Sequence, residues 1–362
     1  MTSLYERAAI LPGRSMTRSK KIFGRWATHG HGAVLHDTEG REYIDMLCAL
    51  GAISLGYRAP VVWDVGGVTS LPWEEEVTAA EAVLQHVAPW ASWVRFVKTG
   101  SESTHAAYRI AKAVTGRSAV WIGDWAFHGW HEWCAESEDI FRHGQDPATF
   151  NHRYPDTIAA VFIEPHRWEP VDVEWLRSVR AFCDRIGALL VFDSMIYGGR
   201  WHLQGTSGYF GVKADLECFG KAFGNGQAVA FVVGTERTKA HGEIPSGTYS
   251  GCTVGLSAVI DTLQEYTTQP VIDTMWARGR QLAAGLDALV SAYPSLLKSR
   301  DGAPVHQRLT FQNPEHGGRF SAEMLSRGVI WHPGCTNVMA AHTPGQIDTV
   351  LIAARESLGA LL

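Results

Sequence analysis

The chain has 362 residues, enough for two domains or one large α/β domain, and its 32 Lys and Arg against 37 Asp and Glu give a net charge of −5. This acidic balance argues against a general nucleic-acid-binding protein, although it leaves room for a local basic groove. The six cysteines form no closely spaced pairs, which indicates a reduced compartment without disulfides and without a zinc site.

The N-terminal residues 1–31 are interpreted as an arm. Residues 1–21 are polar and basic and have no apolar core, so no secretory signal is expected. Across the chain no apolar run approaches the roughly 18 residues of a membrane helix. We therefore expect a cytoplasmic protein without a membrane partner.

The next segments predict a hairpin, a helix and a strand. From Gly32 the pattern GAVLHDTEGREYIDM has apolar runs on both sides of the turn signal DTEG, which predicts a hairpin. Apolar residues at helical spacing predict a helix over Glu74–His86. Trp93–Val97 is predicted as a strand.

A candidate phosphate-binding loop, KTGSES at residues 98–103, follows that strand and opens a helical run to Thr115. Glycine lets the backbone approach an anion, and the free N–H groups at a helix start point toward it. Simple N-capping by Ser101 or Ser103 explains the same pattern and is favoured when the segment is considered alone.

Aromatic residues and histidines gather at residues 125–132, after a predicted strand at Ala119–Ile122. They are typical either of a stacking wall for a flat cofactor or of a core. His128, His131 and Glu132 lack the HExxH spacing and a third ligand, so no metal site is expected.

Two short apolar runs end in carboxylates. Ala160–Ile163 precedes Glu164, and Leu189–Phe192 precedes Asp193, with a helical pattern over Trp175–Ile186 between them. Such runs predict parallel strands buried on both faces, and ligands gather at the carboxyl ends of these strands.

Lys221 lies in the apolar frame FGKAFG, just beyond another predicted strand. An acid at a strand end together with a lysine suggests pyridoxal 5'-phosphate chemistry, which needs a lysine for a Schiff base and an acid at the pyridinium nitrogen. An apolar frame lowers the lysine pKa and supplies a neutral amine. Taken alone, such a lysine is more typical of a solvated surface.

The remaining chain continues the alternation of strands and helices. A glycine- and hydroxyl-rich loop, SGTYSG at residues 246–251, is either a second phosphate contact or a helix-capping turn. The other predicted elements are strands at Val229–Gly234 and Val305–Phe311 and helices at Val254–Tyr266, Thr274–Tyr293, Arg319–Arg327 and Gln346–Leu362.

In order and spacing, these segments resemble the class III aminotransferase family of fold-type I pyridoxal phosphate enzymes, most of all its glutamate-1-semialdehyde 2,1-aminomutase branch. The motifs that carry the resemblance are GAVLHDTEGREYIDM, LGYRAP, FVKTGSESTHAAYRIAKAVTGR, AFHGWHE, AAVFIEP, GALLVFDS, DLECFGKAFGNG, SGTYSG and RGVIWHPGCTNVMAAHTPGQIDTVLIAA. The resemblance implies an α/β fold with a mostly parallel seven-stranded sheet between helices. It places the large domain at residues 32–270, with segment 32–60 packing on a small α+β domain at 271–362.

The resemblance also implies a set of cofactor-binding residues: Gly100, Ser101, Phe127, His128, Glu164, Asp193, Met195, Lys221 and Thr248. Among them, Lys221 is the Schiff-base lysine and proton shuttle, and Asp193 pairs with the pyridinium nitrogen. Gly100 and Ser101 hold the phosphate. Thr248 reaches the phosphate of a neighbouring subunit, which implies a homodimer with active sites at the interface.

The other implied contacts surround the cofactor ring. Phe127 stands where the family has a stacking tyrosine, followed by His128. Met195 packs on the opposite ring face, and Glu164 matches a Glu-Pro carboxylate near the cofactor.

Three departures from the family pattern concern the substrate. Ser194 replaces the usual glutamate after Asp193, so a helper carboxylate is missing. Phe127 lacks the tyrosine hydroxyl, and Leu50-Gly51 replaces Trp-Gly in the substrate wall. Among arginines that could grip a substrate carboxylate, Arg25, Arg167 and Arg200 are interpreted as surface or structural residues.

The leading functional hypothesis is an aminotransferase or aminomutase in which an amine substrate forms an external aldimine and Lys221 acts as general base. The first alternative is decarboxylation, isomerisation or elimination on an amine carried by a nucleotide, a carrier or a modified DNA base. The second is a non-catalytic binding protein, against which the retention of both Lys221 and Asp193 argues.

Overall fold

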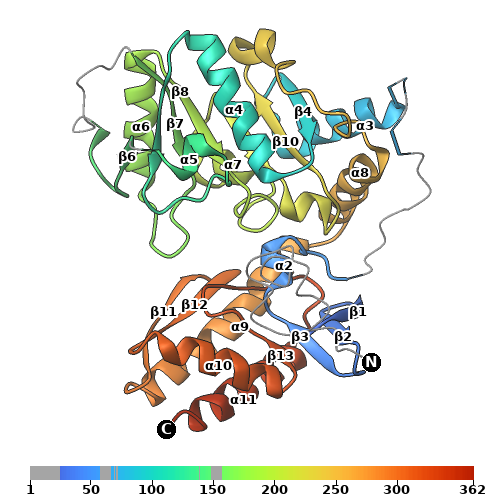
Figure 1. Cartoon of the computed structure of the whole chain (residues 1–362), viewed down its shortest axis with the longest axis vertical. Helices are drawn as coiled ribbons and strands as arrows, with labels where there is room; N and C mark the ends of the chain where they lie inside the picture. Colours follow the sequence, from blue (N-terminus) through green and yellow to red (C-terminus); the bar gives the residue numbers. More distant parts are fainter. Residues whose placement is uncertain (1–24, 58–66, 69, 71, 138, 148–156) are drawn as a thin grey trace.

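In the computed structural model, the described residues are 25–57, 67, 68, 70, 72–137, 139–147 and 157–362 (Figure 1). A seven-stranded sheet forms the centre of the larger part. In spatial order its strands are β4 (Trp93–Val97), β10 (Ala230–Gly234), β9 (Leu216–Phe219), β8 (Leu189–Asp193), β7 (Ile158–Ile163), β5 (Ala119–Gly123) and β6 (Ile140–Phe141). Only β10 runs antiparallel to its neighbours, which confirms the predicted mostly parallel sheet.

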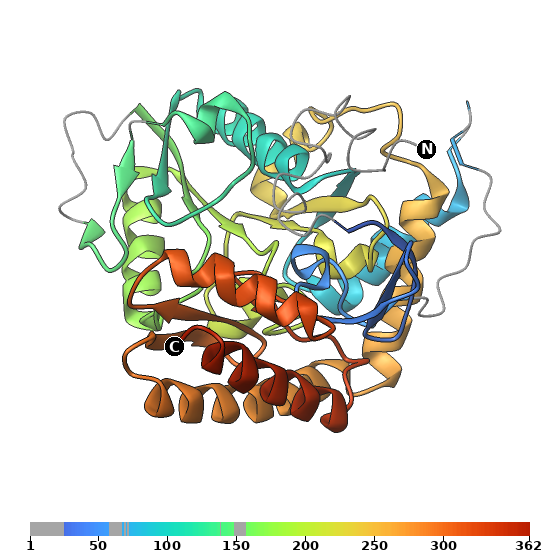
Figure 2. The same cartoon turned by 60° about the horizontal axis from the view of Figure 1, so that its bottom comes forward.

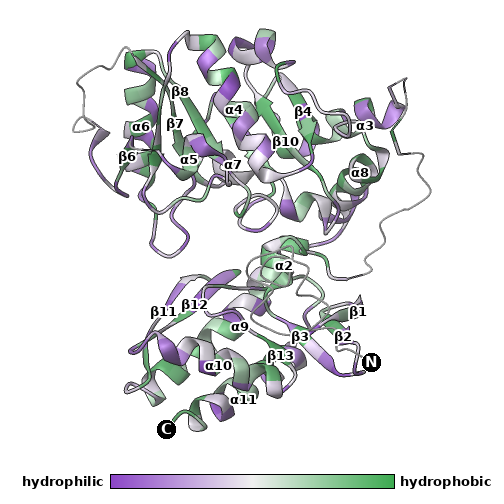
Figure 3. Cartoon of the chain, in the orientation of Figure 1, coloured by the Kyte–Doolittle hydropathy of each residue, from purple (hydrophilic) through white to green (hydrophobic). Residues whose placement is uncertain are grey.

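Helices cover both faces of this sheet because its central strands are apolar on both sides. Along β8 the side chains alternate: Leu189 and Val191 pack under α4 (Gly100–Thr115), whereas Leu190 and Phe192 pack under α6 (Val173–Ile186). Helix α8 (Thr253–Thr268) covers β9 and β10 on the same face as α6. Figure 3 shows the resulting apolar colour of β7, β8 and β10.

Smaller elements connect the layers. The predicted helix at 74–86 is divided into α3 (Glu74–Ala82) and a π-helical turn η4 (Val83–Val87). The others are α5 (Glu132–Ala135), α7 (Gly205–Phe210) and the 3₁₀ turns η7 (Lys221–Gly224) and η8 (Glu236–His241).

The C-terminal part has its own core and its own sheet. Helices α9 (Val271–Ala292), α10 (Glu315–Ser326) and α11 (Pro344–Gly359) lie side by side, orange to red in Figure 2, against strands β11 (Leu297–Ala303), β12 (His306–Phe311) and β14 (Thr336–Asn337). Their buried residues form one cluster that includes Leu286, Phe320 and Ile347. The sequence did not predict β11, because its segment LKSRDGA is mostly polar and becomes a strand by pairing with β12.

The N-terminal segment joins this C-terminal part. Strands β2 (Val34–Asp37) and β3 (Glu42–Asp45) form the predicted hairpin, and β3 pairs in parallel with β13 (Val329–Ile330). The interpretation of residues 1–31 as an arm was wrong for Ala27–His31, which forms strand β1 against β2; residues 1–24 lie outside the described part. Short helix α2 (Cys48–Gly51) follows β3. Within the described residues, no helix has the length and apolar character needed to cross a membrane.

Candidate active site

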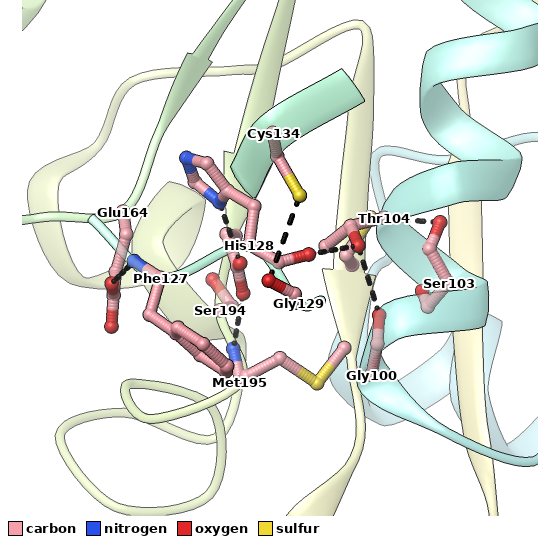
Figure 4. Close-up of polar contacts among 12 residues, drawn as sticks. Gly100, Ser103, Thr104, Phe127, His128, Gly129, Cys134, Glu164, Ser194 and Met195 are labelled. Carbon is pink, nitrogen blue, oxygen red and sulfur yellow. Dashed lines mark hydrogen bonds and ion pairs between the residues drawn. The ribbon is translucent and has the colours of Figure 1, made fainter. Parts of the chain in front are cut away.

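One edge of the large sheet carries most of the predicted site residues. Strands β4, β5, β7, β8 and β9 all run toward this edge, because β10 alone is reversed. Figure 4 shows Phe127, His128 and Gly129 between Glu164 on one side and Gly100, Ser103 and Thr104 of α4 on the other. The arrangement agrees with the rule that ligands gather at the carboxyl ends of parallel strands.

Asp193 at the end of β8 is held by two donors. His128 Nδ1 donates to Asp193 Oδ2 at 2.8 Å, and the Met195 backbone N–H donates to Asp193 Oδ1 at 3.1 Å. Both Asp193 and His128 are buried. The buried His128 Nε2 has no hydrogen-bond partner in the described part of the chain. Each oxygen of the Asp193 carboxylate thus accepts one hydrogen bond and keeps a lone pair for a further donor.

Lys221 follows β9 and opens the turn η7 with a positive φ of 47°. It is half-buried beside Ala222 and Phe223, and burial lowers the pKa of its amine, while the Glu164 and Asp193 carboxylates oppose that change. No described residue accepts a hydrogen bond from its amine. A desolvated, unpaired amine of this kind is suited to attack a carbonyl.

Glu164 is buried at the end of β7 between a backbone N–H donor and a guanidinium. The Phe127 N–H donates to Glu164 Oε2 at 2.9 Å, and the Nε atom of Arg167 lies 3.2 Å from Glu164 Oε1. Burial raises the pKa of Glu164, the Arg167 guanidinium acts to lower it, and Asp193 adds to the rise. The carboxyl group thus links the loop after β5 to the loop after β7.

The first turn of α4 leaves backbone donors free. Thr99, and neither Ser101 nor Ser103, is the N-cap: its hydroxyl accepts from the Glu102 N–H, and Glu102 accepts from the Thr99 N–H. The capping interpretation of the two serines was therefore wrong. In the described chain the N–H groups of Gly100 and Ser101 have no partner, as an anion-binding helix start requires.

Two glycines and a methionine shape this turn. Gly129 has φ +114°, and a Cβ on it would lie 2.6 Å from Ser101 Oγ, so the loop approaches α4 only because this residue is glycine. The Met195 sulfur lies 3.0 Å from the position that a Cβ on Gly100 would take and equally close to that of Gly220. Met195 therefore lies between α4 and the segment that carries Lys221.

Two predicted residues have exposed side chains. The Phe127 side chain is 66% exposed, so within one subunit its ring is not buried against the other site residues. Thr248 lies in an exposed loop and forms no hydrogen bond with any other described residue.

A carboxylate that sequence reasoning missed lies behind Asp193. Glu217 on β9 pairs with Phe192, on the sheet face opposite to Asp193. Ser194 Oγ donates to Glu217 Oε1 at 2.5 Å, and the Thr206 N–H donates to the same oxygen at 2.9 Å. Ser194 thus has a carboxylate partner, which comes from the neighbouring strand and lies on the sheet face away from Asp193. The available signal was an acidic residue inside the apolar strand LECF.

Comparison with known proteins agrees with this geometry. Residues 15–143 and 132–347 match the family described as Aminotransferase class-III. The chain is 30% identical to 3-aminobutyryl-CoA aminotransferase of Cloacimonas acidaminovorans, over 91% of this chain and 88% of that protein. The chain belongs to the class-III aminotransferases.

Other members of the family match at similar levels. Glutamate-1-semialdehyde 2,1-aminomutase of Natronomonas pharaonis is 31% identical over 80% of this chain and 74% of that protein. Among solved structures, the FumI protein of Sphingopyxis sp. MTA144, in its PLP internal aldimine form, superposes with a TM-score of 0.90 at 28% identity, covering 99% and 95% of the two chains. This class-III aminotransferase is thus a pyridoxal-phosphate-dependent enzyme.

The polar groups at the sheet edge fit that cofactor. Among the described residues, the Lys221 amine, His128 Nε2 and the N–H groups of Gly100 and Ser101 have no hydrogen-bond partner, and the Asp193 carboxylate at the end of β8 accepts from His128 Nδ1. They include a nucleophilic amine, an anion-binding turn and an acid, which are the groups that pyridoxal phosphate requires.

Proposed function

We propose that this class-III aminotransferase moves an amino group from a small amine or amino acid, with Lys221 as the lysine that bonds to the cofactor and as general base. The observation that carries the proposal is the desolvated, unpaired Lys221 amine at the sheet edge where Asp193 and His128 are paired. When bound, pyridoxal phosphate supplies a ring that accepts the electron pair released from the substrate carbon.

Each of the site residues has a separate proposed role in the reaction. The Lys221 amine takes the proton from the substrate carbon and returns it. Asp193, held by His128, keeps a negative charge against the ring nitrogen, and the N–H groups of Gly100 and Ser101 bind the phosphate. Met195 and Phe127 bound the two ring faces.

The active unit is proposed to be a homodimer. Thr248 is exposed within one chain, as expected if a second copy covers it. Thr248 would then bind the phosphate of the partner's site.

The test uses Lys221→Ala with the exposed Lys213→Ala as control. Holoenzyme of each is mixed with a panel of amines, and the visible absorbance of the cofactor and the carbonyl product are followed in a single turnover. We expect Lys221→Ala to lose the absorbance of the lysine-bound cofactor and at least about 100-fold in rate, while Lys213→Ala matches the wild type. Full activity in Lys221→Ala would refute the assignment, and release of carbon dioxide by the wild type would establish decarboxylation instead.

A further inference from the structure

Glu217 is a buried carboxyl group that takes no part in the proposed amino transfer. Its neighbours across the sheet are apolar, Phe192 on β8 and Val233 on β10. A carboxyl group in such surroundings is costly unless it is hydrogen-bonded, so its partners indicate what it holds in place. Its hydrogen-bond partners among the described residues are all uncharged groups of one segment, residues 194–207.

The Glu217 carboxyl group contacts both ends of this segment. At the start, Ser194 Oγ lies 2.5 Å from Glu217 Oε1. At the end, the Thr206 N–H donates to the same oxygen at 2.9 Å, and Ser207 Oγ donates to Oε2 at 2.5 Å. Gly205 has φ +60°, and a Cβ on it would lie 2.5 Å from Glu217 Oε1, so this approach requires a glycine. One carboxyl group therefore joins the two ends of the loop.

The segment between these ends carries two residues that shape the active site. Met195 lies between the first turn of α4 and the segment that carries Lys221. Arg200 is fully buried and donates to the carbonyls of Gly51 and Ile53, in agreement with its interpretation as a structural residue. The position of both side chains depends on where the two ends of the loop are held.

We propose that Glu217 is a positioning residue for the cofactor site: by joining both ends of residues 194–207, it keeps Met195 against the cofactor and Arg200 under the turn at residues 48–50. The proposal rests on the proposed function, in which Met195 bounds one ring face. Glu217 lies on the sheet face opposite to Asp193, so it acts on the cofactor only through the segment that it holds.

Protonation of Glu217 provides a readout that a purely structural contact lacks. Burial raises its pKa from 4.5 to about 7, while hydrogen bonds from Ser194 and Ser207 act to lower it. When the segment opens, water reaches the carboxyl group and the pKa returns toward 4.5. Opening therefore becomes easier as pH rises from 4.5 to 7, and the change levels off above 7. The neighbouring Cys218 thiol has a pKa raised by burial and stays protonated throughout this window.

The experiment measures amide hydrogen exchange of residues 194–207 in the holoenzyme at about pH 5 and about pH 8, corrected for the intrinsic effect of pH. The proteins are the wild type, Glu217→Gln and Glu217→Ala, and equilibrium dialysis gives the cofactor Kd of each. Asp215→Asn is the matched control. Asp215 directly precedes the same strand, and its buried carboxylate accepts from the Leu190 N–H at 2.9 Å and from Arg180 at 2.8 Å, both outside the segment.

We expect Glu217→Ala to raise both the exchange of residues 194–207 and the cofactor Kd at least about tenfold. Ser207→Ala, which keeps the carboxyl group, should raise the exchange less. From the lower to the higher pH, the wild type should show a rise in exchange of about 100-fold, whereas Glu217→Gln should stay nearly constant. Asp215→Asn should match the wild type in both readouts, even where its melting temperature is lower.

Wild-type exchange and Kd in Glu217→Ala would overturn the proposal, and so would an equal change in Asp215→Asn. If Glu217→Ala does not fold, the same pH dependence in the wild type and Glu217→Gln would give that negative answer. Neither readout requires turnover. A wild type that binds the cofactor and shows the pH effect but transfers no amino group would therefore refute the proposed function alone.

Discussion

At the scale of single residues, the Lys221 amine is chemically distinct from the exposed lysines. Because burial lowers its pKa, its neutral form persists to lower pH. We predict that, in the cofactor-free protein, reductive methylation by formaldehyde and borohydride continues at Lys221 at pH values where labelling of the exposed Lys213 has fallen. Peptide mass spectrometry across a pH series measures both sites in one sample. Parallel pH profiles for the two lysines would contradict the assignment of an activated amine.

Glu217 offers a second residue-scale prediction because burial raises its pKa from 4.5 to about 7. Between these values the unfolded chain has already released the proton that the folded chain keeps, so the free energy of unfolding falls as pH rises through this window. The full effect is about 3 kcal/mol. Glu217→Gln should remove this fall while keeping an acceptor for the Thr206 N–H.

The measurement is denaturant unfolding of the wild type and Glu217→Gln across the same pH window. Glu81→Gln, at an exposed position of α3, is the control and should follow the wild type. If the wild type and Glu217→Gln lose stability in parallel, Glu217 is not protonated in the folded protein.

At the scale of elements, the segment after β3 is held in an unusual conformation. Cys48, Ala49 and Leu50 all have positive φ, which costs a non-glycine residue about 1 kcal/mol or more each. Asp45 Oδ1 accepts from the Leu47 N–H at 2.8 Å on one side of this turn. Arg200 donates to the carbonyls that follow it. The turn carries Leu50, which the family resemblance places in the substrate wall.

We predict that Arg200→Met lowers the free energy of unfolding by about 3 kcal/mol or more, because three buried carbonyls lose their donor. Urea unfolding measures the change. Arg25→Met is the control, since Arg25 forms an exposed ion pair with Glu39 that is worth less than about 1 kcal/mol. A loss no larger than in the control would show that other contacts hold the turn.

Elements with a strong local pattern could be predicted from the sequence. The structure places β7 and β8 over the predicted apolar runs, extended by two residues and by one, and α6 begins two residues before the predicted helix. The strands β7 and β8 are buried on both faces and α6 is buried on one face. The positions of apolar residues in each segment therefore indicate which of its faces are buried. The same holds for Lys221 and Asp193, which were recognised as a pair because each follows an apolar strand.

Features that depend on distant partners could not be predicted in this way. Strand β11 is polar and exists through its pairing with β12. The role of Glu217 depends on Ser194 and on the start of α7, and the position of Arg167 depends on Glu164 and on the fold of its turn. The sequence immediately around β11, Glu217 and Arg167 therefore contains no periodic pattern that would indicate these partners.

At the scale of the whole molecule, we propose the division into a large part at residues 32–270 and a small part at 271–362. Contacts from residues 42–57 bridge the two. β3 pairs with β13 of the small part, and the Ser54 N–H donates to Asn225 of the large part at 3.2 Å. The segment that carries the strained turn is therefore anchored to both parts of the chain.

The proposed homodimer also concerns the whole molecule. It requires the loop at residues 246–251 to pack on a second copy of the chain. Tyr249 beside Thr248 is 63% exposed, and Trp130 beside the site is 76% exposed. Large aromatic side chains of this kind are enriched at subunit interfaces. If this loop packs on a second copy, a charge placed there must be buried at the interface without a partner.

We therefore predict that Tyr249→Asp weakens self-association at least about tenfold and lowers cofactor affinity with it, because Thr248 is withdrawn from the partner's phosphate. Sedimentation velocity over a concentration series measures association, and equilibrium dialysis measures cofactor binding. Ile352→Asp, at an exposed position of α11, is the matched control and should leave both unchanged. A wild type that sediments as a monomer at every concentration would reject the dimer. A Tyr249→Asp variant that dimerises normally but loses cofactor would place Thr248 at the site of its own chain.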